Sequence, residues 1–256
     1  MGYPLPMFLS VVFPLERDFE GSAAWVRLER GLALLRAQLP YTVEAIAAVE
    51  PGDADRAAAA RRIGLQVVEA DAAGHGALIA TGLLVATGDY RALVDPSWPV
   101  EPEQLLMLLP PAQTGIDLAM ASRLVHGATL TQDPWAYRLL LRLVSRLFGA
   151  LLFAGLADSG SGVLVLRDEA AHAILGRIAE RGEGAEIELC ALARELGFTM
   201  AEVPVDWTVR RGGAGFGLLR PRLSALLRTR ARLKAGAYPP LPKANPEEPG
   251  SEPLTV

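Results

Sequence analysis

The chain has 256 residues, of which 51% are hydrophobic and 21% are charged, and its formal net charge is -4. This composition is ordinary for a globular α/β protein with a sizeable core, and it gives no reason to expect a nucleic acid as partner. A single cysteine, Cys190, excludes an intramolecular disulfide and a cysteine-based metal cluster, and it favours a reducing, cytoplasmic compartment.

Apolar segments of the chain are too short to predict a membrane-spanning helix. The first residues, MGYPLPMFLSVVFP, lack the basic start and the long apolar run of a signal peptide. The most hydrophobic later segment, at 147–157, is far shorter than the roughly 20 residues that cross a bilayer. We therefore expect a chain that is not integral to a membrane.

Between residues 8 and 95, apolar β-branched runs alternate with helical patterns. That alternation is typical of a largely parallel sheet flanked by helices. The predicted elements are, in chain order, a strand at 8–14, a helix at 25–38, a strand at 42–50, a helix at 54–63, a strand at 65–70, a helix at 75–87 and a strand at 90–95.

The pattern changes after residue 95. The predicted elements are then a helix at 102–109, a strand at 117–122, one or two helices at 135–156, a strand at 162–167, helices at 169–181 and 186–196, a strand at 199–207 and a basic helix at 216–234. The last residues are rich in proline, so we expect a single domain over 1–237 and a disordered tail over 238–256.

Carboxylates follow the predicted parallel strands, at the edge where ligands bind to open sheets. They are Glu16, Asp18, Glu50, Asp53, Asp55, Asp71 and Asp95. Clustered acids repel one another unless they share a cation or a hydrogen-bonding ligand, so the cluster indicates a ligand site. The alternative is that Asp53, Asp71 and Asp18 are helix N-caps.

Eight short segments follow one another in a specific order: LSVVFP, AVEPGDAD, GHGALIATGLLVATGDY, ALVDPSWPVEPEQL, ASRLVHGA, DSGSGVLVLRDEAA, EIELCALARELGF and EVPVDW. This order resembles the family 2 glycosyltransferases of the GT-A fold, nearest to the dolichyl- or polyprenyl-phosphate mannosyl- and glucosyltransferases. The resemblance covers residues 8 to about 232. It implies an α/β fold with a mixed, mainly parallel sheet, a nucleotide-sugar half at about 8–123, an acceptor half at about 124–237 and amphipathic C-terminal helices.

The resemblance implies a nucleotide-binding site after the first two strands. Its residues are Pro14, Glu16, Glu50, Gly52 and Asp53. In the family's Asp-Asp-Gly-Ser loop a carboxylate accepts hydrogen bonds from the nucleoside, and Glu50 stands at that position. Pro51, which follows it, has no polar side chain and no backbone donor. Recognition of the base is therefore weakened or rebuilt.

Gly74, His75 and Gly76 match the family's Gly-Lys-Gly loop. A helix that begins at glycines presents backbone N–H groups to a ligand phosphate or carbonyl, and His75 can donate one further hydrogen bond. The alternative is a surface histidine at a helix N-terminus.

Asp95, Pro96 and Ser97 match the family's Asp-X-Asp motif, which holds a divalent cation on the donor phosphates. The first carboxylate is present and the second is replaced by Ser97. Mg²⁺ keeps several waters and needs few protein ligands, so the resemblance still implies Mg²⁺ or Mn²⁺ at Asp95 and Ser97, with reduced affinity.

The remaining motif residues belong to the acceptor half. Arg123, with Arg210 and Arg211 in a glycine-rich lid, would contact phosphates, and Asp158, Glu186 and Glu188 would serve catalysis. In many relatives a carboxylate in the region of Glu186 and Glu188 is the general base. Residues two apart on a helix face different ways, so we expect at most one of this pair to reach the site.

Two segments combine arginines with leucines. Arg138, Arg142 and Arg146 recur every fourth residue beside leucines, and the segment at 210–234 has seven arginines, one lysine and no acid. Such helices can lie in a membrane interface with basic residues on anionic lipid. The alternative is an ordinary amphipathic helix whose apolar side faces the core. The resemblance favours the interface for 135–156.

The expected function is transfer of a sugar, with inversion, from a nucleoside-diphosphate sugar to a lipid phosphate or another acceptor at the cytoplasmic face of the membrane. One alternative is a catalytically degenerate binding or scaffold protein, because several donor contacts are altered. Another is a soluble transferase with a small-molecule acceptor.

Overall fold

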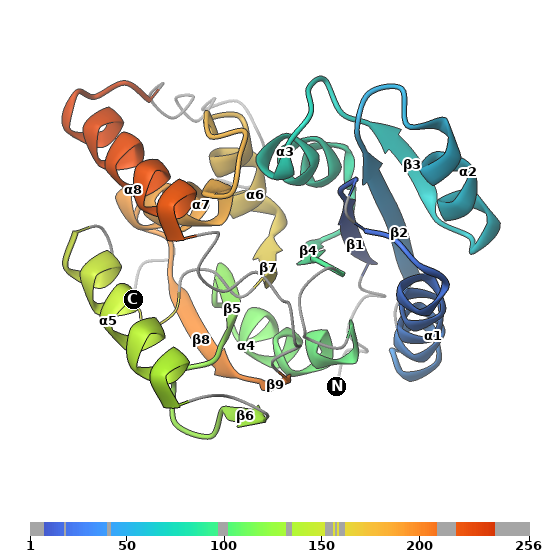
Figure 1. Ribbon diagram of the computed structural model, residues 1–256, viewed down its shortest axis with the longest axis horizontal. Helices are drawn as coiled ribbons and strands as arrows, with labels where there is room; N and C mark the ends of the chain where they lie inside the picture. The colour runs from blue at the N-terminus through green and yellow to red at the C-terminus, as the bar shows by residue number, and fades with distance from the viewer. Residues whose placement is uncertain are drawn as a thin grey trace, which may run out of the picture.

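The computed structural model describes residues 8–17, 19–39, 42–96, 102–131, 135–151, 156, 158, 162–208 and 219–238. Within this part of the chain, a seven-stranded sheet forms the centre of the molecule, with helices on both faces (Figure 1). The end of the predicted proline-rich tail, beyond residue 238, lies outside the described residues.

The sheet has the strand order β3-β2-β1-β4-β7-β5-β8. Its strands are β1 (Phe8–Leu15), β2 (Thr42–Val49), β3 (Gln66–Glu69), β4 (Tyr90–Val94), β5 (Leu118–Ser122), β7 (Val163–Arg167) and β8 (Met200–Pro204). Strand β7 pairs antiparallel with β4 and with β5, whereas the other pairs are parallel. The prediction of a mixed, mainly parallel sheet is therefore confirmed.

Strand β1 lies inside the sheet, between β2 and β4, and is buried from Leu9 to Leu15. A strand that is covered on both faces needs a nearly continuous apolar sequence, which FLSVVFPL supplies. Its alternating side chains feed two cores. Leu9, Val11 and Phe13 join the core under α1, whereas Val12 joins the core under α3.

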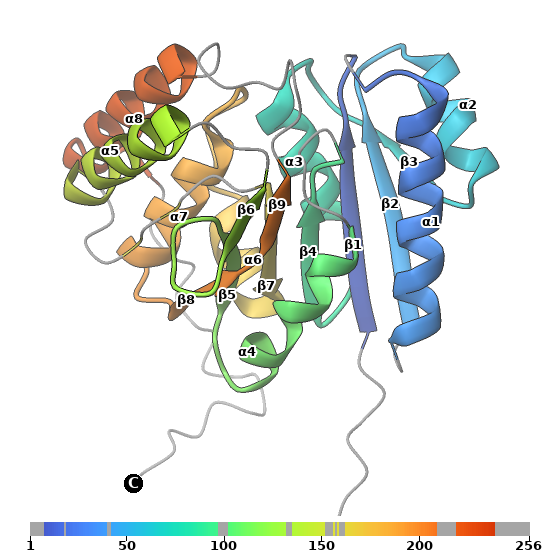
Figure 2. The same ribbon diagram turned by 60° about the horizontal axis from the view of Figure 1, so that its bottom comes forward.

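Helices pack on both faces of the sheet, and their buried side chains complete the core on each face (Figure 2). One face carries α1 (Ser22–Gln38), a 3₁₀ helix (Pro102–Met107) and α4 (Leu109–Gln113), with α2 (Ala54–Arg62) beside β3. The opposite face carries α3 (His75–Val85), α6 (Asp168–Leu175) and α7 (Ala185–Glu195). Two further helices, α5 (Trp135–Leu151) and α8 (Leu219–Lys234), lie on the side of the molecule where the sheet ends in β8.

Three predicted elements differ from the observed ones. The strand predicted at 199–207 is two strands, β8 and β9 (Asp206–Thr208), because β9 leaves the main sheet to pair with β6 (Thr129–Thr131), which the sequence did not predict. The helix predicted at 169–181 ends at Leu175, and the helix predicted at 102–109 is a 3₁₀ helix followed by α4. Among the described residues, no helix combines the length and the apolarity that crossing a bilayer requires.

Candidate functional site

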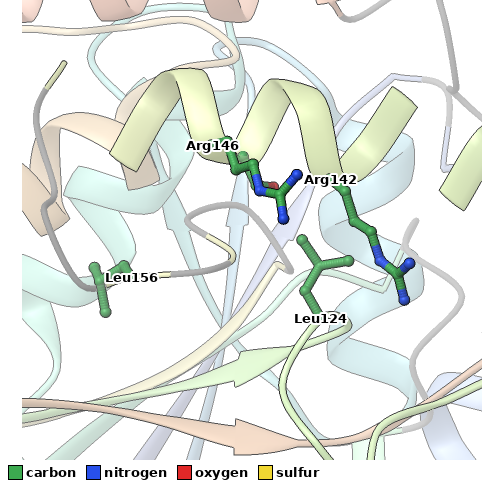
Figure 3. A pocket seen from close by; sticks show the side chains of 5 residues that line it. Leu124, Arg142, Arg146 and Leu156 are labelled. Atoms are coloured by element: carbon green, nitrogen blue, oxygen red, sulfur yellow. The ribbon is translucent and has the colours of Figure 1, made fainter. Parts of the chain in front are cut away.

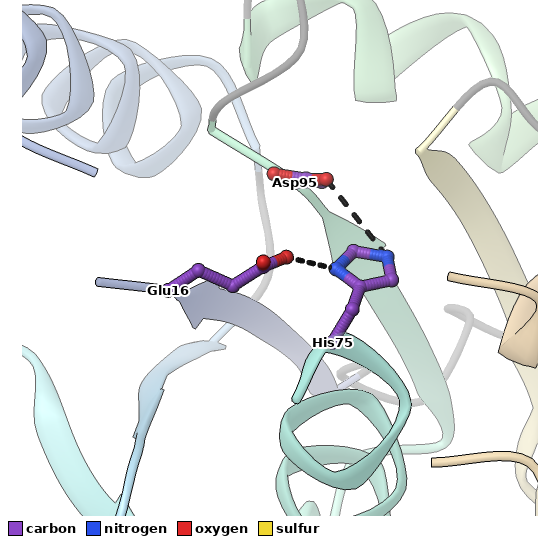
Figure 4. A group of neighbouring side chains, drawn as sticks. All are labelled: Glu16, His75 and Asp95. Carbon is purple, nitrogen blue, oxygen red and sulfur yellow. Dashed lines mark hydrogen bonds and ion pairs between the residues drawn. The ribbon is translucent and has the colours of Figure 1, made fainter. Parts of the chain in front are cut away.

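The carboxyl ends of the parallel strands lie at one edge of the sheet, and three polar side chains meet there (Figure 4). Glu16 follows β1, Asp95 follows the neighbouring β4, and His75 is the first residue of α3. Ligand-capable atoms of these three side chains lie within 4.8 Å of one another. The topology of the sheet therefore assembles the group from segments that are far apart in sequence.

His75 is only 2% exposed, and carboxylates surround its imidazole ring. Its Nδ1 is hydrogen-bonded to the carboxylate of Glu16, and its Nε2 lies 3.1 Å from Oε1 of Glu186 at the start of α7. Asp95, 1% exposed, places Oδ2 at 4.0 Å from the same Nε2. The alternative of a surface histidine at this position is wrong, because the ring lies inside the molecule.

Charges at this site shift the pKa values of His75 and Glu186 in opposite directions. Burial lowers the pKa of His75, but the carboxylates of Glu186, Glu16 and Asp95 outweigh it and raise the pKa well above 6.5. Burial raises the pKa of Glu186, but His75, with a contribution from Arg222 on α8, lowers it to about 2. Near neutral pH the two residues therefore form a buried imidazolium–carboxylate pair.

The glycines around His75 allow another segment of the chain to approach closely. A Cβ atom on Gly74 would lie 2.7 Å from the carbonyl oxygen of Arg181, and one on Gly76 would lie 2.5 Å from that of Glu180. The N–H groups of Gly76 and Ala77 donate to the carbonyl of Arg181 at 3.0 and 3.3 Å. The segment before α7 thus caps the start of α3, and the N–H groups of Gly76 and Ala77 already have a hydrogen-bond acceptor within the protein.

The loop after β2 carries the residues assigned to the nucleoside. Glu50 is 8% exposed and pairs with Nε of Arg17 at 2.6 Å. Asp53 is the N-cap of α2: it accepts hydrogen bonds from the backbone N–H of Arg56 at 3.1 Å and from its Nε at 2.9 Å. Although burial opposes it, hydrogen bonding to Arg56 lowers the pKa of Asp53.

Two other residues assigned to this loop lie close by. The N–H of Gly52 donates to Oε1 of Glu69 at 3.0 Å, and Pro14 pairs with Ala48 inside the sheet. The geometry thus leaves Glu50 as the acid of this loop that lies at the end of a strand and is not a helix cap.

Arg123 and Asp158 are paired with each other. Nε and Nη2 of Arg123 each donate to Asp158 at 2.6 Å, and the backbone N–H of Arg123 donates to the same carboxylate at 3.0 Å. Both residues are buried, and Glu202 on β8 accepts the N–H of Asp158 at 2.8 Å. The planar fork of the arginine is matched to a carboxylate here, in the arrangement that it would offer to a phosphate.

Glu188 lies away from the His75 ring. It is fully buried and accepts hydrogen bonds from the N–H groups of Ala179 and Glu180, from Arg232 and from the hydroxyl of Tyr238. Of the two acids of α7, Glu186 therefore contacts the strand edge, and Glu188 joins α7 to α8.

Three predicted site residues, Ser97, Arg210 and Arg211, lie outside the described residues. The sequence interpretation missed the link from Glu16 through His75 to Glu186, although it named all three residues. The signal for it was the histidine in place of lysine in the glycine-flanked loop, since an imidazole has two nitrogens that can join two acids.

A cavity of about 220 Å³ lies beneath α5 (Figure 3). It is lined by Leu124, Arg142, Ser145, Arg146 and Leu156. Arg142 and Arg146 extend from the helix toward Leu124, which follows Arg123 in the chain. The cavity therefore offers two guanidinium groups near the carboxyl end of β5.

Known proteins resemble the chain in part of its sequence and in its fold. No family model matches the chain. The chain is 34% identical over 113 residues to the polyprenol monophosphomannose synthase of Mycolicibacterium smegmatis. The match spans 44% of this chain and 43% of that protein, so it covers less than half of either.

Solved structures with the same fold include the glucosyl-3-phosphoglycerate synthase of Mycobacterium tuberculosis in complex with uridine diphosphate, which has a TM-score of 0.67 and 20% identity. The same enzyme with Mn²⁺, UDP-glucose and phosphoglyceric acid gives a TM-score of 0.66 at 19% identity. Each comparison covers 88% of this chain and 80% of the other. The GT-A fold that the sequence resemblance predicted is therefore confirmed.

Proposed function

We propose that the chain is a glycosyltransferase that transfers a sugar from a nucleoside-diphosphate sugar to a lipid phosphate. The observation that carries the proposal is the group of Glu16, His75, Asp95 and Glu186 at the carboxyl edge of the sheet. Ligands of open α/β sheets bind at this edge. The same fold holds Mn²⁺ and UDP-glucose in the mycobacterial synthase.

Donor recognition is assigned to Glu50 and Asp95. Glu50, buried at the end of β2, is placed to accept hydrogen bonds from the nucleoside, with Arg17 beside it. Asp95 is the residue of the Asp-X-Asp motif that would hold a divalent cation, and such a cation supplies charge to the departing diphosphate. The buried carboxylate at the end of β4 fits that role.

The acceptor is assigned to the side of α5. Arg142 and Arg146 face the cavity, which suits a phosphate. Leu139, Leu143 and Leu147 recur every fourth residue and are 50%, 53% and 45% exposed. An exposed leucine stripe beside arginines is typical of a helix that lies in a membrane interface, so we assign the acceptor phosphate to a lipid and the enzyme to the cytoplasmic membrane face.

Charge states at the site agree with a phosphate acceptor. A phosphate is already ionised and needs little general base catalysis. Glu186, whose pKa is about 2 beside His75, is a poor base at neutral pH. We therefore assign Glu186 to positioning the imidazole, and the transfer requires no proton abstraction by it.

Donor binding tests the proposal directly. Calorimetry with UDP- and GDP-sugars, with and without Mg²⁺ or Mn²⁺, is expected to show binding that requires the cation and that is lost in Asp95→Ala. Asp71→Ala, which removes an exposed carboxylate at the same edge, is the matched control and is expected to retain binding. Absence of binding by every nucleotide sugar at millimolar concentration would contradict the proposal and favour a non-catalytic protein.

Membrane binding tests the acceptor assignment. Replacing Leu139 and Leu143 by serine is expected to reduce co-sedimentation with anionic vesicles by about tenfold, because each substitution removes apolar surface from the interface. Leu84→Ser, at a residue that is 52% exposed on α3, is the matched control. Equal vesicle binding by all variants would contradict a membrane role for α5.

A small phosphorylated acceptor is the second candidate. It is favoured by the limited size of the α5 cavity, about 220 Å³, and by the phosphoglyceric acid that the mycobacterial synthase binds. A donor-competent protein that glycosylates a soluble phosphate ester and ignores vesicles containing polyprenyl phosphate would support this candidate.

A further inference from the structure

We propose that this chain carries a transition-metal site whose ligands are Glu16, His75 and Asp95, with Glu186 holding the imidazole from its other side. The donor atoms are one imidazole nitrogen, from His75, and carboxylate oxygens from Glu16 and Asp95. The three residues come from three separate segments of the chain, whereas an Asp-X-Asp motif supplies two aspartates from a single segment. Its place in catalysis rests on the proposed function, but its existence does not.

The geometry of the three side chains suits a single ion. In Figure 4 the carboxylates of Glu16 and Asp95 point toward the imidazole ring, and ligand-capable atoms of the three residues lie within 4.8 Å of one another. Ligands at about 2.1 Å from one ion are separated by about 3 to 4.2 Å. Small rotations of the two carboxylates therefore bring all three side chains onto one cation.

Glu186 provides the support that metal-bound histidines commonly have. A ligating imidazole usually gives its second N–H to a carboxylate, which fixes the orientation of the ring. Oε1 of Glu186 lies 3.1 Å from Nε2 of His75, so that Nδ1 faces Glu16. An ion bound at Nδ1 has Glu16 directly beside it and takes the place of the Nδ1 proton, which is released to solvent. Asp95, whose Oδ2 lies 4.0 Å from Nε2, reaches that ion by turning toward the Nδ1 side of the ring.

A second observation also favours a cation. Glu186 is 2% exposed, and its Oε2 has no hydrogen-bond partner in the part of the chain that the structure describes. Three buried or half-buried carboxylates thus converge on one imidazole. Burial of such charges is unfavourable unless a cation offsets them, and a divalent ion supplies more positive charge than a proton on the ring.

The segments that carry the ligands are held in position by the backbone. The carbonyl of Arg181 accepts the N–H groups of Gly76 and Ala77, so the start of α3 is tied to the segment just before α7. His75 on α3 and Glu186 on α7 are therefore placed together whether or not an ion is bound. Little reorganisation is needed for binding, which favours affinity.

The donor atoms indicate which metals the site prefers. Mg²⁺ strongly prefers oxygen ligands in octahedral geometry, whereas imidazole suits Zn²⁺, Cu²⁺, Fe²⁺ and Ni²⁺, and carboxylates suit Mn²⁺. With one imidazole and two carboxylates, affinity is expected to follow Mn²⁺ < Co²⁺ < Zn²⁺, with Mg²⁺ binding more weakly than any of these.

Cobalt binding provides a test that needs no activity. The full chain, freed of metal with a chelator, is titrated with Co²⁺ and followed by its visible absorption, and with Zn²⁺ by calorimetry. We expect one ion per chain, loss of the absorption bands in His75→Gln, and a roughly 10- to 100-fold weaker affinity in Glu186→Gln. His172→Gln, at an exposed histidine paired with Asp168, is the matched control and retains binding.

The outcomes separate this inference from the proposed function. No Co²⁺ or Zn²⁺ binding by the native chain up to millimolar concentration, or unchanged binding by a folded His75→Gln, would overturn the site. If His75→Gln fails to fold, Glu186→Gln and Asp95→Asn are decisive, and unchanged affinity in both also overturns it. Metal binding without any nucleotide-sugar binding supports the site and contradicts the proposed function.

Discussion

His75 is a buried base between acids, and its charge depends on residues that lie far from it in sequence. Burial alone would keep the ring neutral, and the ion pair with Glu186 instead favours the protonated ring. Folding therefore raises the pKa of His75 above 6.5 and lowers that of Glu186 from 4.5 to about 2. Both shifts make stability depend on pH.

The sign of that dependence is different for the two residues. Between 6.5 and the raised pKa of His75, the folded chain holds a proton that the unfolded chain has lost, so stability falls as the pH rises. Glu186 stabilises the fold above 4.5, and this contribution is lost as the pH falls toward about 2. The pair is fully effective between pH 4.5 and 6.5.

We predict that, with metal removed by a chelator, the free energy of unfolding of the native chain falls by about 1.4 kcal/mol per pH unit relative to His75→Gln above pH 6.5. Urea unfolding of both proteins at pH 6.0, 7.0 and 8.0 measures the difference. Parallel pH profiles for the two proteins would show that the folded-state pKa of His75 is not raised.

Gly76 offers a test of the close approach at the start of α3. A Cβ atom there would lie 2.5 Å from the carbonyl oxygen of Glu180, and backbone atoms cannot move aside as a flexible side chain does. We predict that Gly76→Ala lowers the free energy of unfolding by about 1–3 kcal/mol. Gly176→Ala is the matched control, because a Cβ atom at Gly176 meets nothing within 4 Å. Equal unfolding midpoints for the two variants would contradict the prediction.

At the scale of elements, Glu188 joins α7 to α8 through a buried carboxylate. It accepts the hydroxyl of Tyr238 at 2.6 Å and Nη1 of Arg232 at 2.9 Å, while the turn at Ala179 and Glu180 donates two N–H groups to its other oxygen. Burial and the hydrogen bond to Glu188 together raise the pKa of Tyr238 well above its usual value. The carboxylate of Glu188 therefore holds α8 and Tyr238 against α7 and the turn that precedes it.

We predict that Glu188→Gln destabilises the protein by about 2–4 kcal/mol, because an amide cannot accept from all four donors. Urea denaturation is the measurement, and Glu195→Gln, at an exposed acid in the last turn of the same helix, is the control. A loss of stability no larger than that of the control would mean that Glu188 is not needed to hold α8.

Most elements of the sheet could be predicted from sequence because their strands are buried on both faces. FLSVVFPL and the run Tyr90–Val94 are apolar enough to be recognised without tertiary information. Strands β6 and β9 have three residues each, and β6 exists only because it pairs with β9, from which it is separated by about 75 residues. No local pattern marks such a strand.

In the candidate site, too, some residues could be placed from the local sequence, whereas others depend on the tertiary structure. Asp95 could be placed at the strand edge because it directly follows an apolar run, and Glu50 for the same reason. The contact between His75 and Glu186 joins residues 111 apart and depends on how α7 returns to the sheet. The capping of α3 by the carbonyl of Arg181 could not be predicted either, because every residue has a backbone carbonyl and no residue type indicates this role.

For the whole molecule, β7 joins the two parts of the sheet. It lies between β4 and β5, antiparallel to both, and so brings its first residues to the edge where β4 and β5 end. There the N–H of Asp95 donates to the carbonyl of Gly162 at 2.8 Å, and Arg123 binds Asp158. The residues that follow β4 and β5 are therefore each bonded to a residue that precedes β7.

The Arg123–Asp158 pair is the strongest of these connections, and its energetic role can be measured. Both side chains are nearly inaccessible, at 4% and 2% exposed. Removing one partner of a buried pair leaves a desolvated charge, so we predict that Arg123→Met costs about 3–5 kcal/mol in unfolding free energy. Replacing both, by Arg123→Met with Asp158→Leu, is expected to cost less than the sum of the two single changes, because no charge is then left alone.

Arg167→Met is the matched control for this cycle, because Arg167 ends β7 at the opposite edge of the sheet and its side chain is 40% exposed in its pair with Asp117. An exposed ion pair contributes about 0–1 kcal/mol, so this variant should remain near native stability. If Arg123→Met costs no more than Arg167→Met, the fold does not depend on the pair. Arg123 is then available to a ligand phosphate at little cost in stability, whereas a large difference makes Arg123 a structural residue whose release would have to accompany substrate binding.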